Sequence, residues 1–395
     1  MTDAYFDNQP SAEDIETQIA GFGGWYEIDL DALSANLRAI QSRTSAVVMP
    51  VIKNNAYGHG LQPIAAALAA DGIDWFLVAK TREALALRDW FPACNVVNMD
   101  PLYTDAQCRA VVEAGATQVV YSSALAHQLN AAAVSLGKTA GVFIKVDTGL
   151  HRVGIDHAIA IDLIKEIDAL PGLKIQGTYS TQMQDPDNDG LILERYNALL
   201  GKMAEAGIDP GFRSLASTNG IFHDPNSWFD MVRPAMCLFG LYPWVPDRET
   251  DLALRQVLTF KARIEEVKTV KAGDSVTYFG AYAAEKDVKV GTLHVGFYDG
   301  LPRELANKGT IMVGDTACPS IGSVSLNHYL FDASGTDAAI GDVVELIGVD
   351  GPNDLVSTAK TAGWMVYSLL NHLGRHVPRV YRRGGKAVAL LEPPA

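Results

Sequence analysis

The most informative stretch of the sequence is Pro50-Val51-Ile52-Lys53-Asn54-Asn55-Ala56-Tyr57-Gly58-His59-Gly60. It is an apolar run that ends in a lysine and a glycine-rich turn. We expect residues 46–53 to form a buried strand, because apolar and β-branched side chains dominate the run and polar residues follow it. Burial at such a strand end lowers the pKa of a lysine, and a neutral amine forms a Schiff base with an aldehyde. Most lysines at strand ends extend to solvent instead, so Lys53 taken alone leaves both interpretations open.

The same strand belongs to a series of short apolar runs that alternate with helical segments from about residue 25 to residue 243. The expected strands are residues 46–53, 75–79, 95–99, 118–121, 141–146, 174–180, 213–216 and 236–241. Eight strands separated mostly by helices are typical of a (β/α)8 barrel of the TIM type, whose active sites lie at the carboxyl ends of the strands. A doubly wound sheet fits the same pattern.

The pattern becomes mostly β after residue 254. The expected strands there are residues 258–270, 287–297, 310–313, 320–332, 342–349 and 377–381, with one helix at about residues 354–373. The sequence therefore predicts an α/β protein with two domains. These are a barrel over residues 1–253 and a β-rich domain over residues 254–395.

The composition restricts the partners. Asp and Glu number 46 against 32 Lys and Arg, and the net charge of −14 disfavours nucleic acid and anionic membranes. No apolar run reaches the roughly 20 residues of a membrane helix, and the N-terminus does not resemble a secretory signal, so we expect a cytoplasmic protein. The four cysteines are scattered, without the spacing of a zinc site, and we expect neither disulfides nor a bound metal.

Residues 50–60 resemble the pyridoxal 5′-phosphate motif of the alanine racemase family, in which a lysine and one small residue precede Asn-Ala-Tyr-Gly-His-Gly. Asn54, in the position of the small residue, is the one unusual residue. The resemblance implies that Lys53 holds pyridoxal phosphate as a Schiff base and that the Tyr57 hydroxyl contacts the cofactor phosphate. It implies an enzyme that racemises alanine or a related amino acid.

Residues 143–154 are similar to a family strand end whose arginine binds the substrate carboxylate and supports a catalytic tyrosine. The resemblance assigns this role to Arg152, and it matches Lys145 with a lysine that is often carbamylated. A planar guanidinium suits a bidentate carboxylate contact, although an arginine at this position without the motif is more often part of a surface salt bridge.

Two further stretches resemble segments that tune the cofactor and move the proton. Residues 231–243 are similar to the segment whose arginine faces the pyridine nitrogen, a role that falls on Arg233. Residues 273–282 are similar to the segment of the second base, which falls on Tyr278. A phenol has an ordinary pKa of about 10, so it needs a cationic neighbour to act as a base, and Arg152 is the candidate.

Two hydroxyl residues match phosphate contacts of the family. Thr218 occupies the position of a family serine, and Tyr367 matches a tyrosine on a late helix. Each has an ordinary alternative, since a threonine here also suits a turn or helix cap and an aromatic residue also suits the core face of a helix.

Four residues depart from the family pattern and bear on the substrate. Thr181 stands where the family has a histidine stacked on the cofactor ring, and Phe297 replaces a tyrosine at the substrate entrance. Leu326 and Asn327 replace a Met-Asp pair whose methionine amide contacts the substrate carboxylate. Losing a stacked aromatic ring costs about 1 kcal/mol of cofactor binding. The pattern therefore favours racemase chemistry more firmly than it favours alanine as the substrate.

The sequence thus predicts a two-base racemase that forms a head-to-tail homodimer, with Lys53 facing the partner subunit's Tyr278. Alternatives on the same scaffold are a broad-specificity racemase and a decarboxylase, because fold-level likeness does not separate them. A third alternative is a non-catalytic pyridoxal phosphate carrier, although the complete second domain with Tyr278 argues against it.

Overall fold

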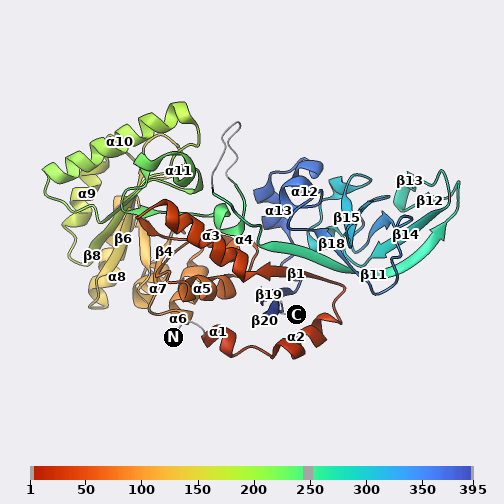
Figure 1. The fold of residues 1–395 in the computed structure, drawn as a ribbon. Coiled ribbons are helices and arrows are strands. Elements are labelled where there is room, and N and C mark those ends of the chain that lie inside the picture. The colour runs from red at the N-terminus through yellow and green to blue at the C-terminus, as the bar shows by residue number, and fades with distance from the viewer. Residues whose placement is uncertain (1–3, 243–251, 393–395) are drawn as a thin grey trace.

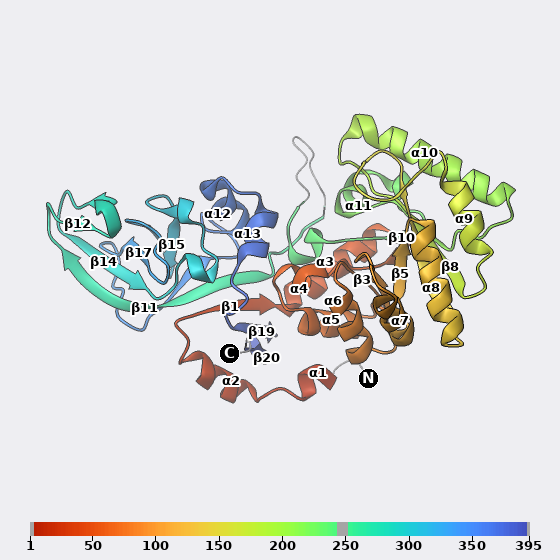
Figure 2. The same ribbon diagram turned by 180° about the vertical axis from the view of Figure 1, so that it is seen from behind.

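The computed structural model describes residues 4–242 and 252–392 and shows two bodies that lie end to end (Figure 1). One body is a barrel of parallel strands wrapped by helices, and the other is a long, mostly antiparallel sheet that carries two helices. Seen from behind, α4 (Lys53–Tyr57) lies near the junction of the two bodies and β12 (Ser275–Val276) lies near the far tip (Figure 2). The predicted α/β architecture, a TIM-type barrel followed by a mostly β region, is confirmed.

Eight parallel strands form the barrel. They are β2 (Val47–Val48), β3 (Trp75–Val78), β4 (Asn95–Asn98), β5 (Thr117–Val120), β6 (Ala140–Asp147), β8 (Leu173–Tyr179), β9 (Phe212–Ser214) and β10 (Met231–Val232). The six strands from β3 to β9 pair in sequence order, and β10 pairs with β2. Bridges from Val51 to Leu77 and from Ser217 to Arg233 join the pair to the six and close the ring.

The strand expected at residues 236–241 is wrong. Residues Met236–Phe239 form a 3-10 helix, and the eighth strand is β10, a few residues earlier. Pro234 follows β10 and has no N–H to continue a ladder, and Gly240 ends the helix with a φ of 82°. A short, fully buried apolar run reads the same whether it is a strand or a helix, which is why the periodicity misplaced it.

Helices lie between the strands and cover the barrel (Figure 1). They are α3 (Leu30–Arg43), α5 (Leu61–Ala70), α6 (Thr81–Trp90), α7 (Asp105–Ala114), α8 (Ser123–Ser135), α9 (Ala160–Asp168), α10 (Pro186–Glu205) and α11 (Thr218–His223). Local signals set several of their ends. In α7 a capping box between Thr104 and Gln107 satisfies the first backbone N–H groups, and left-handed Gly115 closes the helix.

The second body is built on a nine-stranded sheet. Its strands are β1 (Gly24–Asp29), β11 (Leu258–Val270), β14 (Val288–Leu293), β15 (Thr310–Val313), β16 (Thr316–Pro319), β17 (Tyr329–Asp332), β18 (Val343–Ile347), β19 (Arg379–Arg383) and β20 (Lys386–Leu391). A small hairpin pairs β12 with β13 (Tyr282–Ala283). The single helix expected at residues 354–373 is two helices, α12 (Leu355–Ala362) and α13 (Val366–His372), because left-handed Gly363 ends the first.

The N-terminal segment packs against the second body. Strand β1 pairs antiparallel with β11 and parallel with β19. Before it, α1 (Ala4–Asp7) and α2 (Ala12–Ile19) run along the outside, and α2 buries Ile15 and Ile19 against Val380 and Ala387. The division between residues 253 and 254 stays a prediction, and β1 joins the sheet of the later residues although it comes early in the chain.

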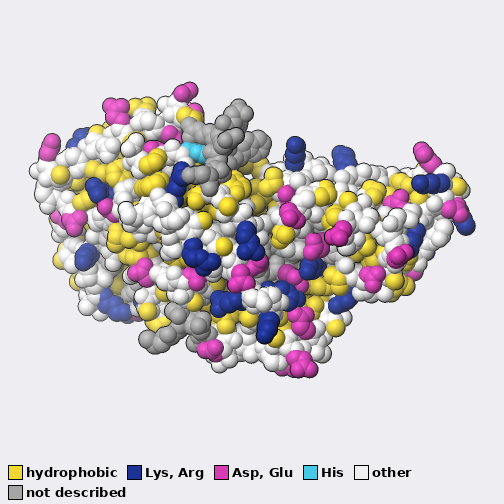
Figure 3. Space-filling model, viewed as in Figure 1, with side chains coloured by type: hydrophobic (Ala, Val, Ile, Leu, Met, Phe, Trp, Pro, Cys, Tyr) yellow, Lys and Arg dark blue, Asp and Glu magenta, His cyan; other side chains and the backbone are white. Residues whose placement is uncertain are grey.

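The surface and the helices bear on the predicted partners. Acidic and basic side chains are intermixed over both bodies on the face that Figure 3 shows. In the part of the chain that the structure describes, every helix is too short or too polar to cross a membrane.

Candidate active site

Lys53 stands where the chain leaves the first barrel strand and enters a left-handed turn. Asn54, Asn55, Ala56 and Tyr57 have φ values between 52° and 59°. Residues with a β-carbon adopt this region rarely, at a cost of roughly 1–2 kcal/mol each, and four in succession are more unusual still. The rest of the fold must hold this turn in place, and such over-determined strain is typical of functional sites.

The carboxylate of Glu83 holds the turn from one side. Glu83 is buried in the first turn of α6, and its two oxygens accept hydrogen bonds from the backbone N–H groups of Asn54 at 3.2 Å and Asn55 at 2.8 Å. A carboxylate that receives two backbone donors makes the stronger, charge-assisted kind of hydrogen bond. Glu83 therefore fixes the backbone directly after Lys53, a role for which the motif contains no signal.

Strand β19 holds the turn from the other side. The Arg379 Nε donates to the Gly58 carbonyl at 2.6 Å, and the Tyr381 hydroxyl donates to the His59 carbonyl at 2.7 Å. A β-carbon at residue 60 would collide with the Tyr381 hydroxyl, which explains why a glycine is needed there. The last strands of the chain thus lock the turn near its start.

The surroundings of Lys53 favour a neutral amine. Burial lowers the pKa of its ammonium group, the Arg152 cation lowers it further, and Glu83 acts in the opposite direction with a smaller effect. A neutral amine is the form that attacks an aldehyde and the form that accepts a proton. Burial and the Arg152 cation therefore favour the neutral amine that the sequence predicts for Lys53.

Arg233 lies beneath the site as a buried cation. Its guanidinium donates to the Ser214 hydroxyl at 2.5 Å and to the Ser180 and Leu215 carbonyls at 2.6 Å and 3.2 Å, and it covers the Tyr179 ring at 4.9 Å. Burial lowers its pKa to about 10, so it stays charged at neutral pH. Because these partners are neutral groups, they leave the positive charge of the guanidinium available to interact with a bound ligand.

Lys145 and Thr181 form a second buried contact. The Lys145 amine donates to the Thr181 hydroxyl at 2.7 Å and lies 4.6 Å from the centre of the Tyr179 ring. Burial holds the pKa of Lys145 well below its ordinary range, and the Arg233 and Arg152 cations add to the shift. The structure thus brings Thr181 to the cluster of cations and places Arg152 within electrostatic reach of both lysines.

Three hydroxyl groups gather around Cys237. Tyr57 and Tyr367 lie with ring centres 6.4 Å apart, and the Thr218 hydroxyl lies 3.5 Å from the Cys237 sulfur while accepting from the Ala235 N–H at 3.0 Å. Burial raises the pKa of the Tyr57 phenol, and it raises the pKa of Tyr367 to about 12. Both phenols therefore stay protonated at neutral pH and offer hydrogen-bond donors to an anion.

The candidates from the second body form a separate group. Tyr278, Phe297, Leu326 and Asn327 line one pocket of about 490 Å³, and Tyr278 is 72% exposed. Tyr278 follows β12 near the far tip of the molecule, whereas Lys53 opens α4 near the junction (Figures 1 and 2). Within one chain the structure does not bring Tyr278 to Lys53 or to the Arg152 side of the site.

Two family models match the chain and together cover most of its length. Residues 28–243 match the model described as alanine racemase, N-terminal domain, and residues 257–381 match the model described as alanine racemase, C-terminal domain. The chain belongs to the alanine racemase family. The family resemblance inferred from residues 50–60 and the later motifs is confirmed.

Individual members of the alanine racemase family match along nearly their whole length. The alanine racemase of Symbiobacterium thermophilum is 33% identical over 366 residues, which cover 90% of this chain and 96% of that protein. The solved alanine racemase of Clostridium difficile 630 has a TM-score of 0.89 at 26% identity, covering 94% of this chain and 98% of that one. The alanine racemase of Bartonella henselae, solved with covalently bound pyridoxal phosphate, has a TM-score of 0.80 at 26% identity, covering 91% of this chain and 100% of that one.

Proposed function

We propose that this member of the alanine racemase family binds pyridoxal 5′-phosphate through Lys53 and racemises alanine or a related amino acid. The observation that carries the proposal is the partly buried Lys53 amine, whose pKa burial and Arg152 lower and which directly precedes a left-handed turn held by Glu83. A reactive amine accounts for this placement.

The residues around Lys53 fit the chemical groups of the cofactor. The amine matches an aldehyde, the hydroxyls of Tyr57, Thr218 and Tyr367 match a phosphate, and the buried Arg233 cation matches an unprotonated ring nitrogen. When bound, pyridoxal phosphate supplies an electron-withdrawing ring that makes the α-proton of an attached amino acid acidic. Thr181, held by Lys145, would lie beside the ring where the family has an aromatic side chain.

The chain's own residues would bind the substrate and move the proton. Arg152 binds the substrate carboxylate as a planar donor, while the Lys53 amine takes or returns the α-proton on one face. Racemisation needs a second acid–base group on the opposite face, and Tyr278 is the candidate. Because Tyr278 lies far from Lys53 in the same chain, we infer a homodimer in which each site receives the partner subunit's Tyr278.

The side chain of the substrate and the place where the enzyme works stay predictions. Phe297, Leu326 and Asn327 line the Tyr278 pocket, so in the inferred dimer they would face the substrate entrance. This supports a racemase whose substrate range extends beyond alanine. The cytoplasmic location stays a sequence-based prediction.

A deuterium-exchange screen tests the proposed function. The chain, loaded with pyridoxal phosphate in D2O, is incubated with each amino acid, and α-deuterium and enantiomer ratio are followed by mass spectrometry and chiral chromatography. We expect exchange into both enantiomers of alanine or of another small amino acid. Loss of the carboxyl group would indicate a decarboxylase, and no exchange with any amino acid would indicate a cofactor carrier.

A further inference from the structure

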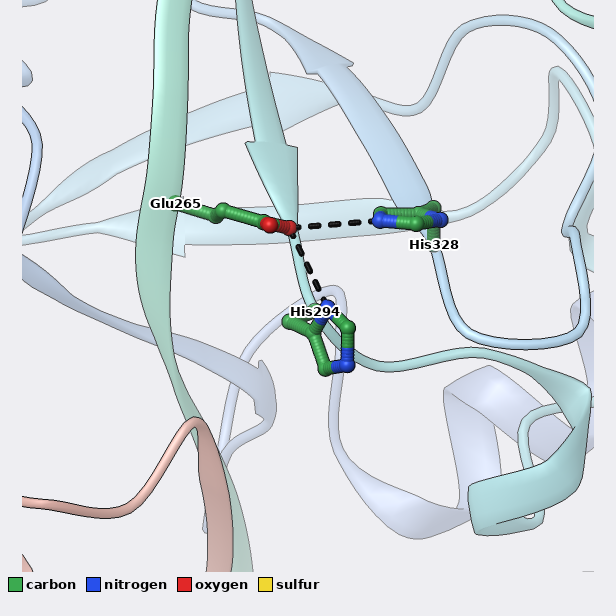
Figure 4. Close-up of side chains that lie close together, drawn as sticks. All are labelled: Glu265, His294 and His328. Atoms are coloured by element: carbon green, nitrogen blue, oxygen red, sulfur yellow. Dashed lines mark hydrogen bonds and ion pairs between the residues drawn. The ribbon is translucent and has the colours of Figure 1, made fainter.

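A carboxylate and two imidazoles converge on the second sheet, away from the Lys53 site (Figure 4). The Glu265 Oε2 lies 3.3 Å from His294 Nδ1 and 3.3 Å from His328 Nε2. The ligand atoms of the three side chains all lie within 4.8 Å of one another. Figure 4 shows each of the two rings turning a nitrogen toward the carboxylate, and the histidines lie next to the ends of two different strands, β14 and β17.

A β-bulge presents Glu265. Strand β11 pairs with β14 through Ile264 and Glu266, and the register shifts between them, so Glu265 is the extra residue. A bulge turns the side chain of the extra residue away from the normal alternation of the strand, and bulges recur next to functional sites. The bulge therefore places the carboxylate beside the ends of the neighbouring strands.

The pairing of β14 with β17 presents the two histidines. Leu293 pairs with Tyr329, His294 directly follows the first residue, and His328 directly precedes the second. The Ser325 N–H donates to the His328 carbonyl at 2.9 Å and holds the loop that leads into β17. The backbone of the sheet, rather than chance contact of long side chains, thus brings the imidazoles together.

The distances fit shared coordination better than two strong hydrogen bonds. Charge-assisted N–H···O contacts are typically about 2.7–2.9 Å long. Two ligands that each lie about 2.0–2.1 Å from a tetrahedral zinc ion are about 3.3–3.4 Å apart. Both contacts of the Glu265 oxygen are 3.3 Å, which matches the ligand separation at such an ion, and the two imidazole nitrogens lie within 4.8 Å of one another.

We propose that Glu265, His294 and His328 bind one divalent transition-metal ion, with Zn²⁺ the best match to two imidazoles and one carboxylate. Calcium and magnesium prefer oxygen ligands, so the imidazoles disfavour them. The three side chains are about half exposed, and water completes the coordination from the solvent side. The ion joins β11, β14 and the residue before β17 and thereby stiffens the sheet.

The metal site adjoins the Tyr278 pocket without depending on the proposed racemase function. His328 lines that pocket together with Leu326 and Asn327, which directly precede it. A bound ion therefore fixes one wall of the pocket. Because binding of the ion is measured directly, the test has the same meaning whether or not the chain racemises amino acids.

The test uses the untagged full chain, dialysed against a chelator and titrated with Zn²⁺ alone by calorimetry. We expect one ion per chain. His294→Asn, His328→Asn and Glu265→Gln should each raise the dissociation constant at least about tenfold, the lower end of what loss of even an outer-shell partner costs a metal site. The matched control is His127→Asn, which removes an exposed histidine that contacts Glu166 at 2.7 Å and should leave binding unchanged.

Two results would overturn the proposal. One is binding at wild-type strength in either histidine variant of the trio, and the other is equal weakening in His127→Asn. Binding of Mg²⁺ as tight as that of Zn²⁺ would overturn the assignment to a transition metal. Melting curves of the metal-free variants provide the folding control, because partly exposed side chains should leave the unliganded melting temperature unchanged, while Zn²⁺ should raise it equally in the wild type and His127→Asn and less in the three site variants.

Discussion

The surroundings of Lys53 and of Tyr278 differ in how completely one chain builds them. Lys53 is held by a strained turn, a buried carboxylate and two side chains of β19, and it lies among buried cations and hydroxyls. Tyr278 is 72% exposed, and its neighbour Phe279 is fully exposed. One chain thus completes the Lys53 half of the site by itself, with the barrel and β19 both contributing, whereas the Tyr278 half stays exposed.

This difference is what a shared site between two subunits requires. In such a shared site, a base on the opposite face of the substrate must reach a molecule that Arg152 and Lys53 of the other subunit already hold. Its side chain therefore has to protrude from the body that carries it. The exposed ring of Tyr278 leaves apolar area in contact with water, and in the proposed homodimer the partner surface would cover that area. The comparison can be tested by changing each half separately.

Lys53→Ala should have the largest effect. The variant should lose the visible absorbance of bound pyridoxal phosphate and lose activity in both directions by at least about a thousandfold, because it lacks both the attachment point and one base. Absorbance spectroscopy with borohydride reduction and peptide mapping measures this. A borohydride-reducible band retained in the variant would end the assignment of Lys53.

Tyr278→Phe should leave cofactor absorbance intact and slow one direction. Loss of a positioned acid–base group costs roughly 10²–10⁴-fold, and we expect it in α-proton exchange from one enantiomer far more than from the other. Tyr103→Phe, a change at an exposed tyrosine of the barrel body, is the control. Equal loss for both enantiomers would show that Tyr278 is not a base on one face.

Glu83→Gln should weaken the Lys53 half of the site. The amide places an N–H₂ group against one of the two backbone donors, which leaves a buried donor unpaired at a cost of about 1–3 kcal/mol. Urea unfolding should show this loss, together with weaker binding of pyridoxal phosphate. Glu113→Gln, at an exposed glutamate of α7 paired with Arg109, should change stability little, and an equal loss in both variants would contradict the role of Glu83.

Lys145→Met should change the dependence of stability on pH. The pKa of Lys145 lies well below its ordinary range in the folded chain, so the unfolded chain binds more protons between the lowered value and about 10.4. Stability contributed by this residue therefore rises with pH across that window. Wild type should gain stability relative to the variant from pH 7 to pH 9.5 in urea titrations, and a constant difference would contradict a neutral buried amine.

Much of the fold could be predicted because it follows from local periodicity. Seven of the expected barrel strands coincide with observed strands, as residues 75–79 do with β3 and residues 141–146 with β6. The errors lie where the local pattern is ambiguous. Residues 236–241 are uniformly apolar and buried, so nothing in their alternation separates a strand from a 3-10 turn.

The candidate site also divides into residues that a local pattern reveals and residues that only packing reveals. Lys53, Tyr57, Arg233 and Thr218 could be named from motifs, since each motif is a short stretch with its chemistry written in order. Glu83 and Arg379 could not, because a helix glutamate and a late arginine look ordinary until packing aims them at one turn. The same reason hid Glu265, His294 and His328, which come from separate strands and meet only through sheet register.

The sequence by itself determined most of the order of strands and helices, the family, and the residue types able to bond an aldehyde, hold a phosphate and move a proton. These properties depend on short stretches of sequence, so they can be recognised without reference to the rest of the chain. Tertiary structure alone decided that four residues after Lys53 are left-handed, that buried Arg233 keeps its charge without a carboxylate among its hydrogen-bond partners, and that Tyr278 projects away from the barrel. Each of these depends on contacts between distant segments, where burial and backbone strain are set by packing rather than by local pattern.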